Sequence, residues 1–428
     1  MTRYIFAMGL VALVTVPAAL SYSVLTHEAI IDSTWDTSIR PVLLKRFPTA
    51  TADELVKAHA FAYGGSIIQD LGYYPFGSRF YSDLTHYVRS GDYIVALIRE
   101  SQNLDEYAFA LGALAHYAAD NSGHSIAVNV TVPLLYPNLR QKYGEVVTYA
   151  DSPAAHGKTE FGFDVFQASR GRYAPSAYKD FIGFEVAKPV MERAFEQTYG
   201  MELKEVFLNV DLAIGSYRRA VGTVLPALTK AAWQINKQQL QKEIPGITRE
   251  KFLYNLSRAS YNQTWGSNYQ KPGIGSRILT FFIRILPKVG PLSAFKFKKM
   301  TPEAEKLYMA SVNTTIERYR SLLADVGANR LKLPNENIDT GDPTVPGKYS
   351  LTDAAYAKLL HKLVEHHAEA SKELRKDVLA FYQDLTLPIA TKKDPEEWTK
   401  VLGDLSQLKA MDAPAEKVTA GAIPKREE

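Results

Sequence analysis

The run ALGALAHYAADNSGHSIAVN, residues 110–129, constrains the fold more than any other part of this chain. It places His116, Asp120 and His124 at intervals of four residues in an alanine- and leucine-rich stretch. Residues i, i+4 and i+8 lie on roughly one face of an α-helix, so three metal-competent side chains would project from one stripe of an otherwise apolar helix. Gly123 is a candidate end of this helix, just before His124.

Helical periodicity also dominates the rest of the chain. Apolar residues recur with helical spacing over residues 51–70, 92–122, 163–168, 177–199, 205–242, 303–325 and 352–384, and alternating strand-like patterns are scarce. Thr51 with Glu54, and Thr301-Pro302-Glu303, have the composition of helix starts. With 46% hydrophobic residues, a chain of 428 residues can bury at least one large core. The sequence predicts an all-α, multi-helix fold.

Residues 1–21 have the composition of a signal peptide. Arg3 precedes an apolar run that is too short for a comfortable membrane span and that ends in small residues. Cleavage after Ser21 would leave Tyr22 as the mature N-terminus, although the preceding alanines allow other cleavage sites. We therefore expect an exported protein, either periplasmic or secreted.

Composition divides the remaining chain into further parts. Residues 331–350 collect Pro, Gly, Asn and Asp between two helical patterns, which predicts a linker. This linker would separate a helical domain over residues 22–330 from a C-terminal helical extension over residues 351–410. Residues 411–428 lack apolar periodicity, and we expect a loose tail there.

The histidines are concentrated in the first part of the chain. Six of the nine lie between residues 27 and 156, and five of these six have a carboxylate at a useful spacing. The residues of this pattern are His27, Asp70, His86, His116, Asp120, His124, His156 and Glu160. His59 has no such neighbour, and we expect it to be a packed or surface residue.

The ligand chemistry of this pattern favours zinc. Zinc binds neutral imidazole nitrogen and carboxylate oxygen, and the absence of cysteine excludes thiolate ligands. Two zinc ions about 3.5 to 4 Å apart can bind a phosphate ester and supply hydroxide. One pair such as His156 and Glu160 could equally be a surface helical pair. Five pairings in one chain favour a zinc site suited to phosphodiester hydrolysis.

In this order the residues resemble the zinc-dependent phospholipase C family, which shares its fold with fungal-type single-strand nucleases. The resemblance covers residues 22–165 and is carried by an N-terminal aromatic residue and the eight His, Asp and Glu residues above. It implies an all-helical, exported protein that binds up to three zinc ions. The implied ligands are the free amino terminus, five histidines and a few carboxylates.

The resemblance also implies how the metals share their ligands. One implied zinc set comprises Asp70, His86, His116 and Asp120. A second implied set comprises His124, His156 and Glu160. The third comprises His27, Asp120 and the amino nitrogen and carbonyl oxygen of Tyr22. In this arrangement Asp120 bridges two zinc ions.

Three features depart from the family pattern. Tyr22 stands where the family usually has Trp, although backbone atoms make the metal contact. The step from Asp120 to His124 is two residues shorter than the usual Asp-to-His step. The chain is also much longer than the catalytic domain of typical members, so the resemblance assigns no role to residues 200–428.

The resemblance implies a phosphodiester hydrolase. We expect a phospholipase C that hydrolyses glycerophospholipids with zinc-bound hydroxide, and Asp70 would orient or deprotonate the attacking water. A single-strand-type nuclease is one alternative. A zinc-stabilised helical binding module without catalytic activity is an alternative of another class. No obligate protein partner is evident.

Two further segments bear on the substrate. Tyr73, Tyr74 and Phe76 are candidates for a substrate pocket because the surrounding Gly and Pro predict a turn near the metal, although core packing is the alternative. Residues 273–300 interleave apolar side chains with six basic ones, so this segment could contact an anionic membrane surface. The alternative for it is a buried helix flanked by Lys and Arg.

Overall fold

The structure, a computed structural model, describes residues 24–169, 184–219, 241, 298, 300–365 and 370–411. Over these residues the chain is helical apart from one two-stranded ribbon, which confirms the predicted all-α fold. The predicted signal peptide, Tyr22, the tail after Met411 and all of residues 273–300 except Lys298 and Met300 lie outside the described residues. None of the described helices combines the length and apolar character needed to cross a membrane.

The elements follow one another along the chain in three groups. The first group is α2 (Val24–Thr34), the π-helical turn η1 (Trp35–Ile39), α3 (Arg40–Arg46), α4 (Ala52–Gly65), the 3-10 turn η2 (Ile68–Tyr73), α5 (Arg79–Tyr87), α6 (Ser90–Glu100) and α7 (Leu104–Gly123). The second is the π-helical turn η3 (His124–Val128), α8 (Asn129–Leu135), α9 (Pro137–Tyr143), α10 (Pro153–Ser169), α12 (Lys188–Tyr199), α13 (Leu203–Val206) and α14 (Val210–Arg219). The third is α19 (Pro302–Gly327), β1 (Glu336–Asn337), β2 (Asp342–Pro343), α20 (Ser350–Glu365), α21 (Lys372–Phe381), the 3-10 turn η7 (Ala390–Lys393) and α22 (Pro395–Ala410).

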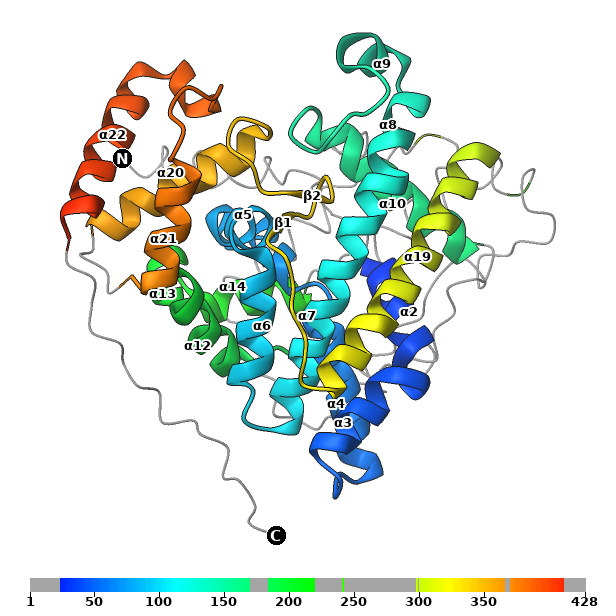
Figure 1. Cartoon of the computed structure of the whole chain (residues 1–428). Helices are drawn as coiled ribbons and strands as arrows, with labels where there is room; N and C mark the ends of the chain where they lie inside the picture. The colour runs from blue at the N-terminus through cyan, green and yellow to red at the C-terminus, as the bar shows by residue number, and fades with distance from the viewer. Residues whose placement is uncertain are drawn as a thin grey trace, which may run out of the picture.

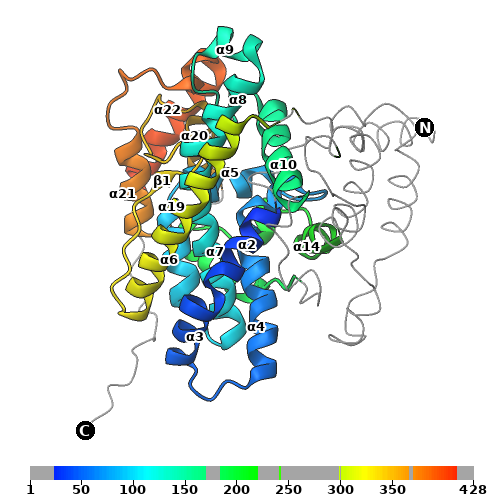
Figure 2. The same ribbon diagram turned by 90° about the vertical axis from the view of Figure 1, so that its right-hand side faces the viewer.

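Helix α7 is the central element of the molecule and packs against α4, α6 and α19 (Figures 1 and 2). It begins where the Asn103 side chain accepts a hydrogen bond from the Glu106 amide, and its residues from Glu106 to Gly123 are buried. Small side chains allow α4 to approach it closely. A Cβ added at Gly112 would lie 2.0 Å from the carbonyl oxygen of Ala62. The alanine-rich run is therefore a buried helix that other helices surround.

Both predicted helix starts are confirmed. Thr51 and Glu54 form a reciprocal capping box at the start of α4. The Thr301 hydroxyl accepts a hydrogen bond from the Ala304 amide, so that α19 begins at Pro302. Local capping chemistry thus sets these two boundaries.

Several of the long periodic runs are interrupted in the structure. The run 51–70 is divided between α4 and η2, and the run 205–242 is broken between α13 and α14. The run 92–122 is divided between α6 and α7, because Asn103 caps a new helix. In the run 177–199 the described residues before α12 are not helical, and α12 begins at Lys188 with Pro189 in its first turn. In the run 352–384, α20 ends at Glu365 and Ser371 caps α21. Apolar periodicity continued across these breaks because the successive helices pack on the same core.

Residues 331–349, which we call the strap, lie against the body of the molecule. In it β1 and β2 pair antiparallel, with Glu336 opposite Pro343, and β1 contacts α5 and α6 (Figure 1). The Ile338 amide donates a 3.1 Å hydrogen bond to the His86 carbonyl, and Ile338 and Asp339 are buried. The segment has the turn residues predicted for a linker, including Gly341 with φ of +74°. It is also an integral part of the core.

The C-terminal helices α20, α21 and α22 form a small cluster beside α5 (Figure 1). Leu359, Leu360 and Leu363 of α20 are fully buried, and the Tyr356 ring stacks on Phe381 of α21 at a centroid distance of 3.7 Å. The strap is the direct connection from α19 to this cluster. The predicted division of the chain into separate domains stays a prediction.

Candidate metal centre

The structure brings together all eight His, Asp and Glu residues of the sequence pattern. Their elements are α2 for His27, η2 for Asp70, α5 for His86, α7 for His116 and Asp120, η3 for His124, and α10 for His156 and Glu160. None of these residues is more than 3% exposed. They form three groups that could hold a metal ion, and in each group the ligand atoms lie within 4.8 Å of one another. Tyr22, the predicted terminal ligand, is outside the described residues.

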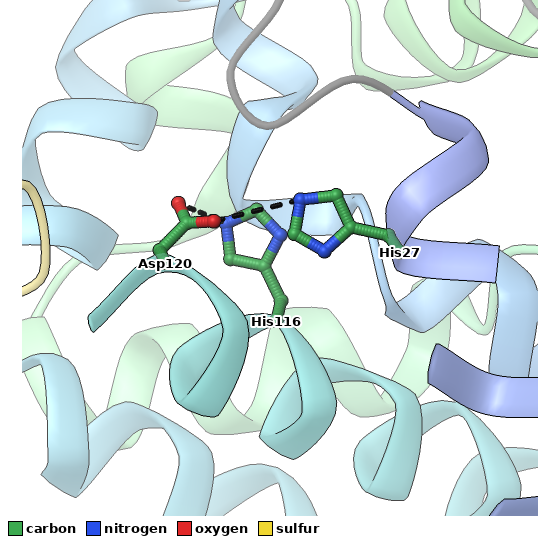
Figure 3. Close-up of side chains that lie close together, drawn as sticks. All are labelled: His27, His116 and Asp120. Carbon is green, nitrogen blue, oxygen red and sulfur yellow. Dashed lines mark ion pairs between the residues drawn. The ribbon is translucent and has the colours of Figure 1, made fainter. Parts of the chain in front are cut away.

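The first group comprises His27, His116 and Asp120 (Figure 3). His116 Nε2 lies 3.0 Å from Asp120 Oδ2, and His27 Nε2 lies 3.5 Å from Asp120 Oδ1. The two imidazole rings stack at a centroid distance of 4.6 Å. Both oxygen atoms of one carboxylate therefore face histidine nitrogens.

The second group comprises Asp70, His86 and His116 and adjoins the first. His86 Nε2 lies 3.3 Å from Asp70 Oδ1 and 3.5 Å from Asp120 Oδ2. Asp120 thus stands between His27 on one side and His86 on the other. A carboxylate in this position can bridge two metal ions.

The third group comprises His124, His156 and Glu160. Glu160 Oε1 lies 3.2 Å from His124 Nε2 and 3.1 Å from His156 Nδ1. The rings of His124 and His156 are perpendicular, with centroids 5.0 Å apart. The predicted four-residue step from His156 to Glu160 places both side chains on the same face of α10.

The short step from Asp120 to His124 has α-helical geometry, because the His124 amide donates to the Asp120 carbonyl, and a π-helical turn begins only at His124. Helix α7 ends at Gly123, and in η3 the Asn129 amide donates to the His124 carbonyl, which is an i to i+5 bond. Such turns change the direction of side chains relative to an α-helix and occur often at functional sites. His124 belongs to a different group from His116 and Asp120, although the three lie on one run of sequence.

Three of the histidines are oriented by their second ring nitrogen. His86 Nδ1 lies 2.8 Å from the Ser82 carbonyl oxygen, and His116 Nδ1 lies 2.9 Å from that of Ser66. His156 Nε2 lies 3.0 Å from Asn129 Oδ1. A carbonyl oxygen only accepts, so the contacting nitrogen is the one that carries hydrogen. In the neutral ring, the other nitrogen then directs its lone pair into the cluster.

The polar atoms that face the cluster fit a metal. The nitrogens His86 Nε2, His116 Nε2 and His156 Nδ1 and both carboxylate oxygens of Asp120 and Glu160 are buried and make no hydrogen bond within the described part of the chain. Such atoms are costly in a protein interior. Nitrogen and carboxylate oxygen are ligands that zinc prefers, and a cation would satisfy these atoms together.

The metal-free cluster gives its histidines opposite pKa shifts. Burial, with His116 nearby, lowers the pKa of His27 to about 3. Burial also favours the neutral ring of His86, but the nearby carboxylates of Asp120 and Asp70 outweigh it and raise the pKa to about 10. Burial acts to raise the pKa of Asp120, but His116 and His124 lower it well below its usual value. Burial and the neighbouring charged groups therefore perturb the protonation of these side chains strongly.

Asp339 of the strap also reaches the third group, and the sequence reasoning did not identify it. Its Oδ1 lies 3.2 Å from His124 Nδ1, and its Oδ2 accepts hydrogen bonds from Tyr87 and Tyr349 at 2.7 and 2.6 Å. Asp339 is 3% exposed. It lies in a turn-rich stretch where an Asp is ordinary, so the sequence held no signal for it.

The three predicted pocket residues have different surroundings. Tyr73 is half-buried, and its ring centroid lies 6.0 Å from that of His86. Tyr74 is buried and packs edge-on against Tyr217, whereas Phe76 is 53% exposed with φ of +64°. Tyr149, which the sequence reasoning did not single out, lies 5.7 Å from the ring of His156. Tyr73 and Tyr149 thus lie beside the metal groups, as does Tyr87, whose ring centroid is 5.8 Å from that of His86.

His59 lies apart from the three groups, in line with the expectation of a packed residue. Its ring stacks on Trp35 at 3.8 Å, and its Nε2 lies 3.1 Å from Asp32 Oδ1. Neither His59 nor Asp32 belongs to the eight-residue pattern. His59 serves below as a reference histidine.

Comparison with known proteins bears directly on this cluster. The family model described as zinc dependent phospholipase C matches residues 26–209, which include all eight of the clustered residues. No curated protein and no solved structure gives a significant match to the chain. The family match confirms the resemblance read from the order of the histidines and carboxylates. Residues 26–209, less than half of the chain, are similar to the zinc-dependent phospholipase C family.

Proposed function

We propose that the protein is an exported, zinc-dependent phospholipase C that hydrolyses glycerophospholipids. The observation that carries the proposal is the set of three adjoining groups of buried ligand atoms around Asp120. Each group has three candidate ligands, with His116 common to the first two groups. Catalytic zinc sites that keep one position open typically have three protein ligands. A purely structural zinc site is usually closed by four protein ligands, so this count argues against the non-catalytic alternative.

The residues of the cluster have distinct roles in this proposal. His86, His116, Asp120, His124, His156 and Glu160 would hold zinc, together with His27 and Asp70. Bound zinc would polarise the phosphoryl group and lower the pKa of a water molecule. Asp70 lies on the short η2 turn beside His86, where its carboxylate can orient that water and accept its proton. Asp120 keeps the neighbouring histidines aligned from both of its oxygen atoms.

The third zinc would lie at His27 and Asp120 and be completed by the amino terminus at Tyr22. The start of α2 supports this, because it is fixed close to the proposed cleavage site. The Leu25 amide donates to Asp164 Oδ2 at 2.8 Å, and the Thr26 hydroxyl donates to Asp164 Oδ1 at 2.5 Å. These bonds hold the chain three and four residues after Tyr22, the terminus that the ligand set requires.

The test uses phosphatidylcholine vesicles and, separately, single-stranded DNA, with zinc present and with a chelator added. We expect chelator-sensitive release of phosphocholine and no release of nucleotides. Asp70→Asn should lower turnover by roughly 10²- to 10⁴-fold, the usual contribution of a general base, and leave the zinc content largely unchanged. Asp105→Asn removes the same charge at a surface ion pair with Lys57 and should retain full activity.

Three results would contradict the proposal in different ways. Release of nucleotides alone would assign the chain to the nuclease branch. If the zinc-bound protein releases product from neither substrate, phospholipase C activity is overturned and the non-catalytic module is favoured. Unchanged turnover in Asp70→Asn would remove Asp70 from the mechanism while leaving the zinc assignment intact.

A further inference from the structure

The third metal group contacts a residue from outside the family match. Asp339 lies on the strap, far along the chain from Glu160, and the match ends at residue 209. Its carboxylate is nevertheless buried beside His124. The region that the family match leaves unassigned therefore takes part in the architecture of the cluster.

The two nitrogens of His124 face different carboxylates. Nε2 lies 3.2 Å from Glu160 Oε1, on the side of the metal group, and Nδ1 lies 3.2 Å from Asp339 Oδ1. A histidine that binds metal through one nitrogen commonly donates the N–H of the other to a carboxylate. That contact fixes the tautomer and the ring orientation and makes the ligating nitrogen more basic. Asp339 occupies this outer position.

Asp339 is itself held rigidly. Tyr87 and Tyr349 donate hydroxyl hydrogens to its Oδ2, which leaves Oδ1 directed at His124. Its amide donates to Asn337 Oδ1 at 3.0 Å. The positive φ of Gly341 turns the strap back two residues later, where a Cβ would lie 3.0 Å from the Asn121 carbonyl oxygen. The carboxylate therefore has little freedom to move away from the histidine.

The backbone of Asp339 reaches the second histidine of the group as well. Its carbonyl accepts a 2.7 Å hydrogen bond from Asn129 Nδ2, and Asn129 Oδ1 lies 3.0 Å from His156 Nε2. One strap residue thus contacts His124 through its side chain and His156 through Asn129. Both contacts are to the nitrogen that faces away from Glu160.

We propose that Asp339 is a positioning residue for zinc at His124, His156 and Glu160, and that it keeps His124 Nδ1 protonated and Nε2 directed at the metal. The inference rests on the zinc chemistry of the proposed function and extends it to the strap. Asp339 is an outer carboxylate in this arrangement and does not touch the substrate. Its loss should weaken one zinc site and leave the other two intact.

The experiment measures zinc rather than turnover. Asp339→Asn and the wild-type protein are loaded with zinc and titrated with a competing chelator, and metal content is followed at each step. We expect a 10- to 100-fold loss of affinity at one of the zinc sites, the usual cost of removing an outer-shell partner. Cadmium-113 spectra of the substituted protein should show one altered resonance and unchanged remaining ones.

Glu336→Gln is the matched control. Glu336 lies on the same strap and accepts hydrogen bonds from Tyr117 and Arg318, away from the metal groups. Glu336→Gln should alter the charge of the strap by the same amount as Asp339→Asn and leave the zinc affinity of every site unchanged. If Asp339→Asn fails to fold, Tyr87→Phe removes one of the hydroxyls that hold Asp339 and should cause a smaller loss at the same site.

The outcomes separate this inference from the proposed function. If a folded Asp339→Asn protein keeps full zinc affinity at all sites, the role of Asp339 is overturned and the proposed function is not affected. Where Asp339→Asn does not fold, the same result in Tyr87→Phe has the same meaning. Equal weakening of every site would overturn the role of Asp339 as well, because the effect would then be general. A wild-type protein without tightly bound zinc would overturn the proposed function and this inference together.

Discussion

At the scale of single residues, the cluster combines histidines that differ in protonation before any metal binds. With a pKa lowered to about 3, His27 is neutral at pH 7, whereas His86, with a pKa raised to about 10, carries a proton. Burial acts in the same direction on both rings, and the nearby carboxylates decide the difference. In the metal-free protein, Asp120 and Asp70 thus form ion pairs with a protonated His86. When zinc is bound, the two carboxylates would be zinc ligands beside a neutral His86.

Zinc uptake should therefore release protons. Zinc needs a neutral imidazole, and the pKa of His86 near 10 means that its proton must leave at pH 7.5. The pKa of His124 is also raised well above its usual value, because Asp120 and then Asp339 outweigh burial. We expect about two protons released per fully loaded protein, and zinc affinity that rises with pH up to about 10, where His86 loses its proton without metal. Calorimetry in two buffers of different ionisation enthalpy measures this release.

His59→Gln provides the control for this prediction. His59 also lies beside an aspartate, but it is outside the metal groups, so the variant should release the same number of protons. A heat of zinc binding that does not depend on the buffer would contradict the assignment of a protonated His86.

The metal ligands could be predicted from the sequence more completely than the groups that orient them. The spacing of His116 and Asp120, and of His156 and Glu160, follows from helix geometry, so both pairs can be read without a structure. The partners of the second ring nitrogens include the backbone carbonyls of Ser66 and Ser82, which any residue type would supply. No sequence pattern therefore marks them, and Asp339 is hidden for a related reason.

At the scale of elements, the approach of α4 to α7 fixes the helix that carries His116 and Asp120. Gly65 faces Phe109 and Gly112 faces Ala62, and a Cβ at either glycine would lie 2.0 Å from a backbone carbonyl oxygen. Neither atom is the end of a flexible side chain, so the helices would have to move apart. The alanine-rich composition predicted a mostly apolar helix, but composition alone does not say which helix covers it.

Gly112→Ala should destabilise the protein despite the better helix propensity of alanine. Overpacking in a core typically costs about 1 to 3 kcal/mol, more than the roughly 1 kcal/mol that Ala gains over Gly inside a helix. Gly403→Ala in α22 is the control, because nothing lies within 4 Å of a Cβ there. It should stabilise by up to about 1 kcal/mol. Chemical denaturation measures both free energies, and equal effects would contradict the close contact.

At the scale of the whole molecule, the strap joins parts that the sequence separates. Residues 331–349 contact α5 and α6, and α20 beyond them packs on α5 again. The Pro, Gly, Asn and Asp content of this segment describes its turns correctly, because turn residues report local backbone shape. Composition does not report what a turn packs against, and burial of Ile338 and Asp339 depends on helices far away in sequence.

Chelation should lower the thermal stability of the entire molecule. Zinc that binds the folded state and not the unfolded chain stabilises it by about 4 kcal/mol at a thousand times its Kd. Without zinc, Asp70, Asp120 and Glu160 remain buried in one cluster. We expect EDTA to lower Tm by several degrees in differential scanning fluorimetry and added zinc to restore it. The calcium complex of EDTA controls for chelator effects other than metal removal, and an unchanged Tm would contradict a zinc-bound core.

The contact between Asp339 and His124 has a consequence for the timing of assembly. A ribosome makes the chain from its N-terminus at roughly 5 to 20 residues per second, so Asp339 follows Glu160 after roughly 10 to 35 seconds. Throughout that interval the nascent protein contains every histidine of the centre and lacks the carboxylate that lies beside His124. The third metal group can therefore reach its final geometry only after Asp339 has been made.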